Sequence, residues 1–443
     1  MPLHSLRVRN VGPFEDAFFE FDEHVNVFVG PNNSGKSTVL WALGDIAVNP
    51  FLFPEKLLRG NGARFDASYT GVDSKVKTLR GEHPIGLSED EEGYWTDSRY
   101  AEAIGVVEAL GYTCFIPALR RSTDYRSGGP SAGENGVTAR ALRGKSGEEI
   151  AELVRELRTG RHGDRQRLML ATLGPDPMQI EDSDVIQSLV DLDYKAYREE
   201  RPSVRKVFDA LAKVASDITE GFPIRFTGVA EDKRGLFPKF STPDGELPLN
   251  TLSQGTQSIV QWLGRFLVNL AEHYHYPEDL ESQRAVLIID EIDAHLHPSW
   301  QRRILPALTK TFPKLQIFCS THSPLMISGL KAGQVHLLNR DAKGKVTVSR
   351  NETDIVGWSA DEILRNILDV PNPTDLATAE KIQRLQELRR KKLPTKADKD
   401  ELEALRENVG SDLLGAPISD EILSLAQKAL GKTGAGRKRS RVR

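Results

Sequence analysis

Gly30-Pro-Asn-Asn-Ser-Gly-Lys-Ser37 is the most informative stretch of this 443-residue chain, because it fits the pattern G-x-x-x-x-G-K-[ST] of a phosphate-binding loop. The apolar run 25–29 before it predicts a strand, and residues 38–46 after it predict a helix, so a chance match is disfavoured. Glycines let backbone N–H groups turn toward phosphate oxygens, and the helix start adds partial positive charge. The residues expected to bind ATP are Gly30, Pro31, Asn32, Asn33, Ser34, Gly35, Lys36, Ser37 and Thr38.

Two side chains of this loop have specific expected roles. Lys36 supplies a positive charge to the β- and γ-phosphates, which makes it a candidate catalytic residue. The Ser37 hydroxyl is a candidate ligand for Mg²⁺. ATP and Mg²⁺ are therefore the expected cofactors.

A second motif, Ala285-Val-Leu-Ile-Ile-Asp-Glu291, places two acidic residues after an apolar strand. Ligands of open α/β sheets bind at the carboxyl ends of strands. Asp290 is there expected to hold Mg²⁺, and Glu291 to orient or deprotonate the attacking water. The alternative is an acidic helix cap, which Asp and Glu also favour.

A third motif, Leu252-Ser-Gln-Gly-Thr-Gln257, comes directly before a predicted helix over residues 257–273. A helix start attracts anions, and the less favoured alternative is that Ser253 is an ordinary N-cap. A fourth motif is the β-rich run 315–319, which continues into Ser320-Thr-His322. A lone histidine is usually structural, but His322 follows a predicted strand end about 30 residues after the acidic pair.

The order and form of these four motifs resemble the ABC ATPase superfamily, whose signature is close to L-S-G-G-Q. The resemblance implies that His322 contacts the γ-phosphate and helps to hold the attacking water. It also implies that the signature binds the γ-phosphate held by a second copy, in a homodimer. The signature residues concerned are Ser253, Gly255 and Gln257.

The pair His295 and His297 could suggest a metal site. Two histidines without a further cluster of ligands are a weak metal signal. The resemblance implies instead that this segment is the start of the helix after the acidic motif, which is the favoured interpretation.

Strands that alternate with helices predict an α/β fold with a mixed, mostly parallel sheet and flanking helices, the P-loop NTPase head of ABC type. The N-terminal part of the head is expected over 1–121 and its C-terminal part over 222–345. A flexible loop and helical arm are expected over 122–221, and a helical extension with a basic tail over 346–443.

The opening Leu6-Arg-Val-Arg-Asn10 and the segment Asp290–Pro298 resemble the RecF and overcoming-lysogenisation-defect (OLD) ATPases. No glutamine of a Q-loop and no Toprim nuclease segment can be assigned. The helical segment that begins at Val356 is instead similar to the ATPase subunit of Septu phage-defence systems, which acts with a separate HNH nuclease. A partner nuclease and a role in anti-phage defence are therefore expected.

The overall composition limits the class of protein and the cellular compartment. The net charge of −4 excludes a globally basic nucleic-acid-binding protein. Two cysteines, the lack of a leader-like N-terminus and the short apolar runs predict a cytoplasmic protein without a membrane span.

Two other functions remain open. One is a RecF-like DNA-repair ATPase that binds DNA itself; the candidate contacts are Arg120, Arg121, Arg389, Arg390, Lys391, Lys392, Arg437, Lys438 and Arg439. The other, disfavoured by the form of the signature, is the ATPase of a membrane transporter.

Overall fold

The computed structural model describes residues 2–48, 63–71, 73–83, 109–116, 183–198, 202–232, 235–370, 373–391 and 395–414. The chain divides into two compact units, Met1–Ile363 and Leu364–Arg443. Residues 122–182 of the predicted loop and helical arm, and the basic tail, lie outside the described residues.

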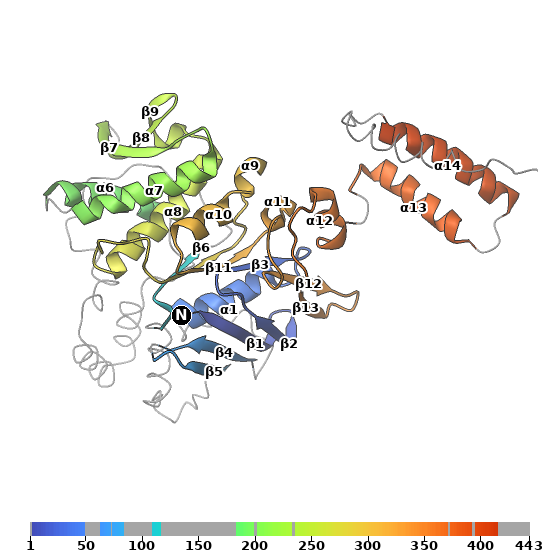
Figure 1. Ribbon diagram of the computed structural model, residues 1–443, viewed down its shortest axis with the longest axis horizontal. Coiled ribbons are helices and arrows are strands. Elements are labelled where there is room, and N and C mark those ends of the chain that lie inside the picture. Colours follow the sequence, from blue (N-terminus) through green and yellow to red (C-terminus); the bar gives the residue numbers. More distant parts are fainter. Residues whose placement is uncertain are drawn as a thin grey trace, which may run out of the picture. The chain divides into compact units, whose positions relative to one another are not determined.

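A six-stranded sheet in the order β13-β12-β3-β11-β10-β6 organises the first unit (Figure 1). It is parallel except for its edge strand β13, which runs antiparallel to β12. Its central strands β3, β10 and β11 are apolar and buried along their whole length, as expected where helices or other layers cover both faces of a sheet. The strands are β3 (Val25–Val29), β6 (Tyr112–Ile116), β10 (Ala285–Ile289), β11 (Leu315–Ser320), β12 (Val335–Arg340) and β13 (Val346–Arg350).

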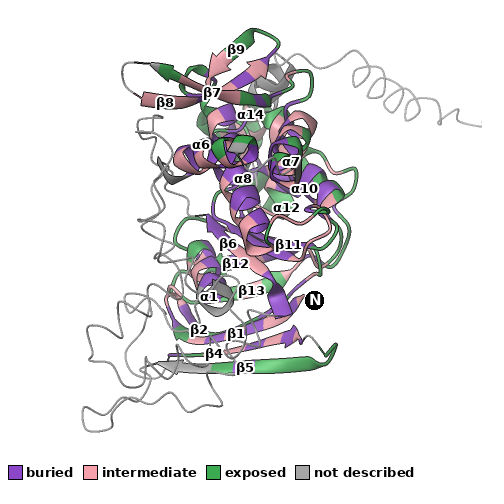
Figure 2. Ribbon diagram, turned by 90° about the vertical axis from the view of Figure 1, so that its left-hand side faces the viewer, coloured by how far each residue is buried: buried purple, intermediate pink, exposed green. Residues whose placement is uncertain are grey.

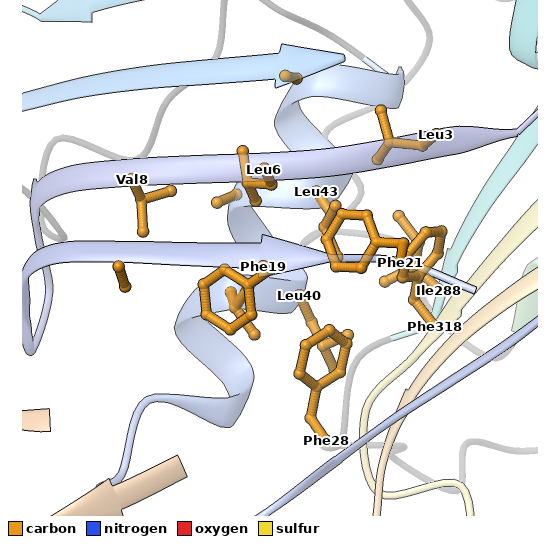
Figure 3. Close-up of a cluster of buried hydrophobic side chains, with 14 of the residues drawn as sticks. Leu3, Leu6, Val8, Phe19, Phe21, Phe28, Leu40, Leu43, Ile288 and Phe318 are labelled. Atoms are coloured by element: carbon orange, nitrogen blue, oxygen red, sulfur yellow. The ribbon is translucent and has the colours of Figure 1, made fainter. Parts of the chain in front are cut away.

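An antiparallel sheet and helix α1 (Lys36–Val48) cover one face of the six-stranded sheet. The antiparallel sheet has the order β2-β1-β4-β5, and its strands are β1 (Leu3–Val11), β2 (Phe14–Glu20), β4 (Ala63–Thr70) and β5 (Val76–His83). Alternate residues of β1, such as Leu6 and Val8, are buried, whereas Arg7 and Arg9 pair with acids on the other face. Figure 3 shows Phe19 near Leu40 and the main-sheet residue Phe28, so one core joins the two sheets through α1.

Helices cover the opposite face of the six-stranded sheet (Figure 2). The central one, α8 (Gln254–His273), is buried over most of its length, and α6 (Ser183–Arg198) and α7 (Pro202–Thr219) pack on it. The described part of the predicted arm is therefore packed against the head. A small sheet lies beyond these helices, in the order β7 (Arg225–Asp232), β8 (Gly235–Thr242), β9 (Gly245–Pro248).

The expectation that helices begin at residue 346 is wrong. Residues Val346–Arg350 form β13, which pairs with β12 at the edge of the main sheet. The strand is short and alternates buried and exposed residues, so its apolar signal is weak. Helix α12 (Ala360–Asn366) follows it.

The second unit contains a helical hairpin of α13 (Leu376–Arg390) and α14 (Lys396–Leu414). The Arg384 guanidinium pairs with both carboxylate oxygens of Glu401 at 2.8 and 3.0 Å, which fixes how the two helices align.

Candidate nucleotide-binding and catalytic site

Close packing explains the glycines of the P-loop. Gly30 has φ +152°, and a Cβ there would collide with the carbonyl of Leu338 on the neighbouring strand β12. Gly35 has φ +99°, and its Cβ would lie 2.6 Å from the ring of Pro13. Only glycine fits both positions without movement of the neighbours.

Lys36 is buried and folded back onto the loop. Its Nζ donates to the carbonyls of Gly30 at 2.9 Å and Pro31 at 3.1 Å. Burial lowers the pKa of Lys36, while the charges of Asp290 and Glu291 oppose that change. The lysine charge therefore lies within electrostatic reach of the acidic motif.

The loop also has features that fit a phosphate ligand. The Ser34 hydroxyl is buried and has no hydrogen-bond partner among the described residues, and Ser37 is exposed at the start of α1. An unpartnered buried hydroxyl is costly, and a ligand oxygen would satisfy it. The remaining predicted contacts Pro31, Asn32 and Asn33 are exposed, and Thr38 is partly buried.

Asp290 and Glu291 are held at the end of β10 by the adjacent strand β11. The Ser320 hydroxyl donates to Asp290 Oδ1 and accepts from the backbone N–H of Glu291, with N and Oγ 2.7 Å apart. Glu291 itself has φ +50°, a left-handed conformation that turns the chain sharply after the strand. Ser320 thus fixes both acidic residues.

His322 lies two residues beyond β11. The backbone before it is tied to β3 through Thr321 N, which donates to Phe28 O at 3.2 Å. The pKa of His322 is lowered, first by burial and then by the positive charge of Lys36. A neutral imidazole is therefore expected at neutral pH; it has one N–H group that can donate a hydrogen bond and one nitrogen that can accept one.

The structure thus brings Lys36, Asp290, Glu291 and His322 to the carboxyl ends of three neighbouring strands, β3, β10 and β11. This edge is where ligands of open α/β sheets bind.

The signature residues lie at the start of α8. The Ser253 hydroxyl is an N-cap: it accepts from Thr256 N at 3.2 Å, and its residue is exposed. Gln257 donates to the Leu252 carbonyl at 2.7 Å. A Cβ at Gly255 would lie 2.7 Å from the carbonyl oxygen of His295. The cap interpretation is therefore correct, and it leaves Ser253 accessible to a ligand.

His295 and His297 follow the acidic motif, and the structure gives His297 a local hydrogen-bonding role. No group of three or more potential metal ligands occurs in the described part of the chain. His297 caps the short helix α9 (Pro298–Gln301), with Nδ1 3.3 Å from Ser299 N, as the favoured interpretation expected.

Two family models match the chain. An AAA domain model matches residues 5–47, which contain the P-loop. A second model, "AAA domain, putative AbiEii toxin, Type IV TA system", matches residues 178–328, which contain the other three motifs. The Septu protein PtuA of Bacillus thuringiensis is 22% identical over 384 residues, which cover 83% of this chain and 84% of that protein. The chain is an ABC-like AAA ATPase.

The chain is also similar in sequence to a retron ATPase and in structure to SMC head domains. The Retron Ec83 probable ATPase of Escherichia coli is 34% identical to this ATPase over 122 residues, 27% of this chain and 21% of that protein. Among solved structures, the SMC head domain from Thermotoga maritima is 13% identical, with a TM-score of 0.39, and covers 80% of this chain and 100% of that one. The Smc head domain from Pyrococcus furiosus is 14% identical, with a TM-score of 0.44, and the match covers 79% of this chain and 96% of that one.

Two residues of the ATPase site were missed by the sequence analysis. Ser320 can be recognised only once the parallel register Ile289↔Cys319 is known, because that register puts residue 320 beside Asp290. Arg340, at the end of β12, donates to the Asn33 carbonyl at 3.0 Å and so supports the tip of the P-loop. No sequence signal connects these residues, which are 307 positions apart.

The basic residues predicted to contact nucleic acid differ in their surroundings. Lys391 is paired with both oxygens of Asp398, at 2.7 and 2.8 Å, whereas Arg389 and Arg390 are exposed. Arg120, Arg121, Lys392, Arg437, Lys438 and Arg439 lie outside the described residues. Among the described helices of the ATPase, none is long and apolar enough to cross a membrane.

Proposed function

We propose that two copies of this ATPase close head to head around two ATP molecules. Each ATP would lie between the Lys36 loop of one copy and the Ser253 turn of the other, and the two-fold symmetry makes the two sites equivalent. One observation carries this proposal: Ser253 is an exposed residue whose hydroxyl, among the described residues, bonds only within its own turn, whereas Lys36 belongs to the cluster at the strand ends.

Within each site, Glu291 orients or deprotonates the attacking water, and neutral His322 hydrogen-bonds the γ-phosphate. Ser37 and Asp290 would hold Mg²⁺, which supplies positive charge that offsets the charge of the phosphates. The fit rests on the unpartnered Ser34 hydroxyl in the loop and on the hard oxygen donors at the strand ends.

We further propose that the ATP-closed dimer regulates a partner nuclease in anti-phage defence. The support is the similarity to the Septu protein PtuA along most of both chains, together with the retron ATPases. A RecF-like function with direct DNA contact is the second candidate, and the exposed pair Arg389 and Arg390 favours it.

The first experiment uses two inactive variants. Lys36→Ala and Ser253→Ala should each lose ATP hydrolysis alone, the first because ATP binding is lost. Mixing them should restore activity, since a mixed dimer has one site with both an intact loop and an intact signature. Random pairing makes half of the dimers mixed, with one working site of two, so recovery of about a quarter of wild-type activity is expected. A mixture as inactive as its components would overturn the dimer.

The second experiment tests the catalytic assignment. Glu291→Gln should bind ATP and accumulate as a dimer by light scattering, because closure remains possible while hydrolysis is blocked. Wild-type turnover in this variant would falsify the role of Glu291.

A further inference from the structure

Gln301, the last residue of α9, joins two segments through its side-chain amide. Its Nε2 donates to the Leu296 carbonyl at 3.0 Å, and its Oε1 accepts from the Ser323 hydroxyl at 2.6 Å. Both ends of the amide are therefore used, and rotation of the side chain would break both bonds. The two partners belong to different parts of the site.

The first partner belongs to the turn that packs on the signature. Leu296 follows His295, whose carbonyl oxygen lies 2.7 Å from the position of a Cβ at Gly255. The ring of Trp300, directly before Gln301, lies 3.1 Å from the same position. These distances leave no room for a side chain at position 255, so the turn packs close to the backbone of α8, and we expect a shift at the start of α8 to move the turn as well.

The second partner belongs to the histidine loop. Ser323 is buried, and besides donating to Gln301 its hydroxyl accepts from Leu325 N at 3.1 Å. The Ser323 backbone N–H donates to Thr321 Oγ1 at 2.9 Å. His322 therefore lies between two residues held by hydrogen bonds, and the Gln301 bond is the one that leads to the signature side.

We infer that Gln301 is a positioning residue that couples the signature turn to His322, so that nucleotide bound at the signature of one copy sets the histidine of that same copy. This inference rests on the proposed dimer and on the proposed role of His322. The physical requirement is modest, because a displacement of about 1 Å in a catalytic group can cost about 100-fold in rate.

The test compares Gln301→Met, which keeps the length of the side chain and removes both bonds, with Ser323→Ala and the double variant. Each single variant should lower kcat about tenfold, and the double variant should lower it no further, because residues that share one bond are not additive. The KM for ATP should change less than twofold. Gln283→Met is the matched control: Gln283 donates to the Asp279 carbonyl at 2.7 Å, before the start of β10.

Unchanged kcat in Gln301→Met, or single effects that multiply in the double variant, would overturn the inference. If Gln301→Met does not fold, Ser323→Thr and Ser323→Ala decide: the hydroxyl of Thr should keep kcat, and equal losses in both variants would count against the coupling.

Other experiments test the proposed function itself. Wild-type kcat in His322→Ala would refute the proposed role of the histidine. If the mixture of Lys36→Ala and Ser253→Ala recovers no activity, the proposed dimer is refuted. If both of those tests succeed and Gln301→Met is unaffected, only the coupling is refuted.

Discussion

Replacing Ser320 by alanine is the sharpest test of how the acidic pair is held. The side chain is fully buried, donates to the Asp290 carboxylate and accepts from Glu291 N at 2.7 Å. A hydrogen bond to a charged group contributes about 1.5–3 kcal/mol, and one between neutral groups about 0.5–1.5 kcal/mol. Loss of both predicts that the free energy of unfolding falls by about 2–4.5 kcal/mol.

Urea unfolding followed by tryptophan fluorescence measures this loss, and ATP turnover measures its effect on the site. We expect kcat to fall while ATP binding is retained, because Lys36 and the P-loop keep their contacts. Ser68→Ala is the control: its hydroxyl bonds the Ser5 hydroxyl at 2.6 Å in the antiparallel sheet, so about 0.5–1.5 kcal/mol is expected. The reasoning is refuted if Ser320→Ala loses no more unfolding free energy than the Ser68→Ala control and keeps the wild-type kcat.

Three other predictions concern different parts of the molecule. Gly255→Ala should lower the free energy of unfolding of the head by about 1–3 kcal/mol, because the new methyl group would lie 2.7 Å from the His295 carbonyl oxygen. The variant should also need more ATP to dimerise, as measured by light scattering. Dimerisation at the same ATP concentration as the wild type would contradict this prediction. Burial lowers the pKa of His336 to about 3, so the unfolded chain binds a proton that the folded chain does not, and stability should decrease as pH falls below the unfolded pKa of about 6.5. Between pH 6.5 and 4, the unfolding midpoint should change less with pH in His336→Phe than in the wild type. An unchanged dependence would mean that other groups cause the loss of stability. If DNA binds the hairpin, the double variant Arg389→Glu, Arg390→Glu should lose salt-sensitive DNA affinity while Lys391→Ala keeps it, because Lys391 is already paired with Asp398; equal losses would contradict that distinction.

The sequence predicts the elements of this fold better than their connections. Val25–Val29 and Ala285–Ile289 are apolar runs of strand length, and both are central strands of the main sheet. The apolar stripe that includes Val204 and Leu211 predicts a helix, and α7 buries both residues. Val346–Arg350 was missed because a short edge strand with one buried face carries few apolar residues.

In the candidate site, too, local motifs can be predicted from the sequence and contacts between distant segments cannot. The P-loop and the acidic pair can be predicted because each is a contiguous motif whose chemistry depends on local backbone. Ser320 and Gln301 cannot, because their importance comes from a hydrogen bond across two segments 29 or 22 residues apart. Serine and glutamine are also common polar residues, so neither type marks a site until the register of the strands is known.

The charges at the strand ends give a physical reason why the proposed closure of two copies would depend on ATP. The charge of Lys36 is within electrostatic reach of three carboxylates, those of Asp290, Glu291 and Asp293, so the strand ends beside it carry more negative than positive charge. ATP adds more negative charge, which would be tolerated there with Mg²⁺ and with the positive end of a second helix. The exposed start of α8 in another copy offers that helix end, capped by Ser253. Hydrolysis would remove the anionic group nearest to that helix end, and the attraction that holds the proposed dimer closed would then weaken.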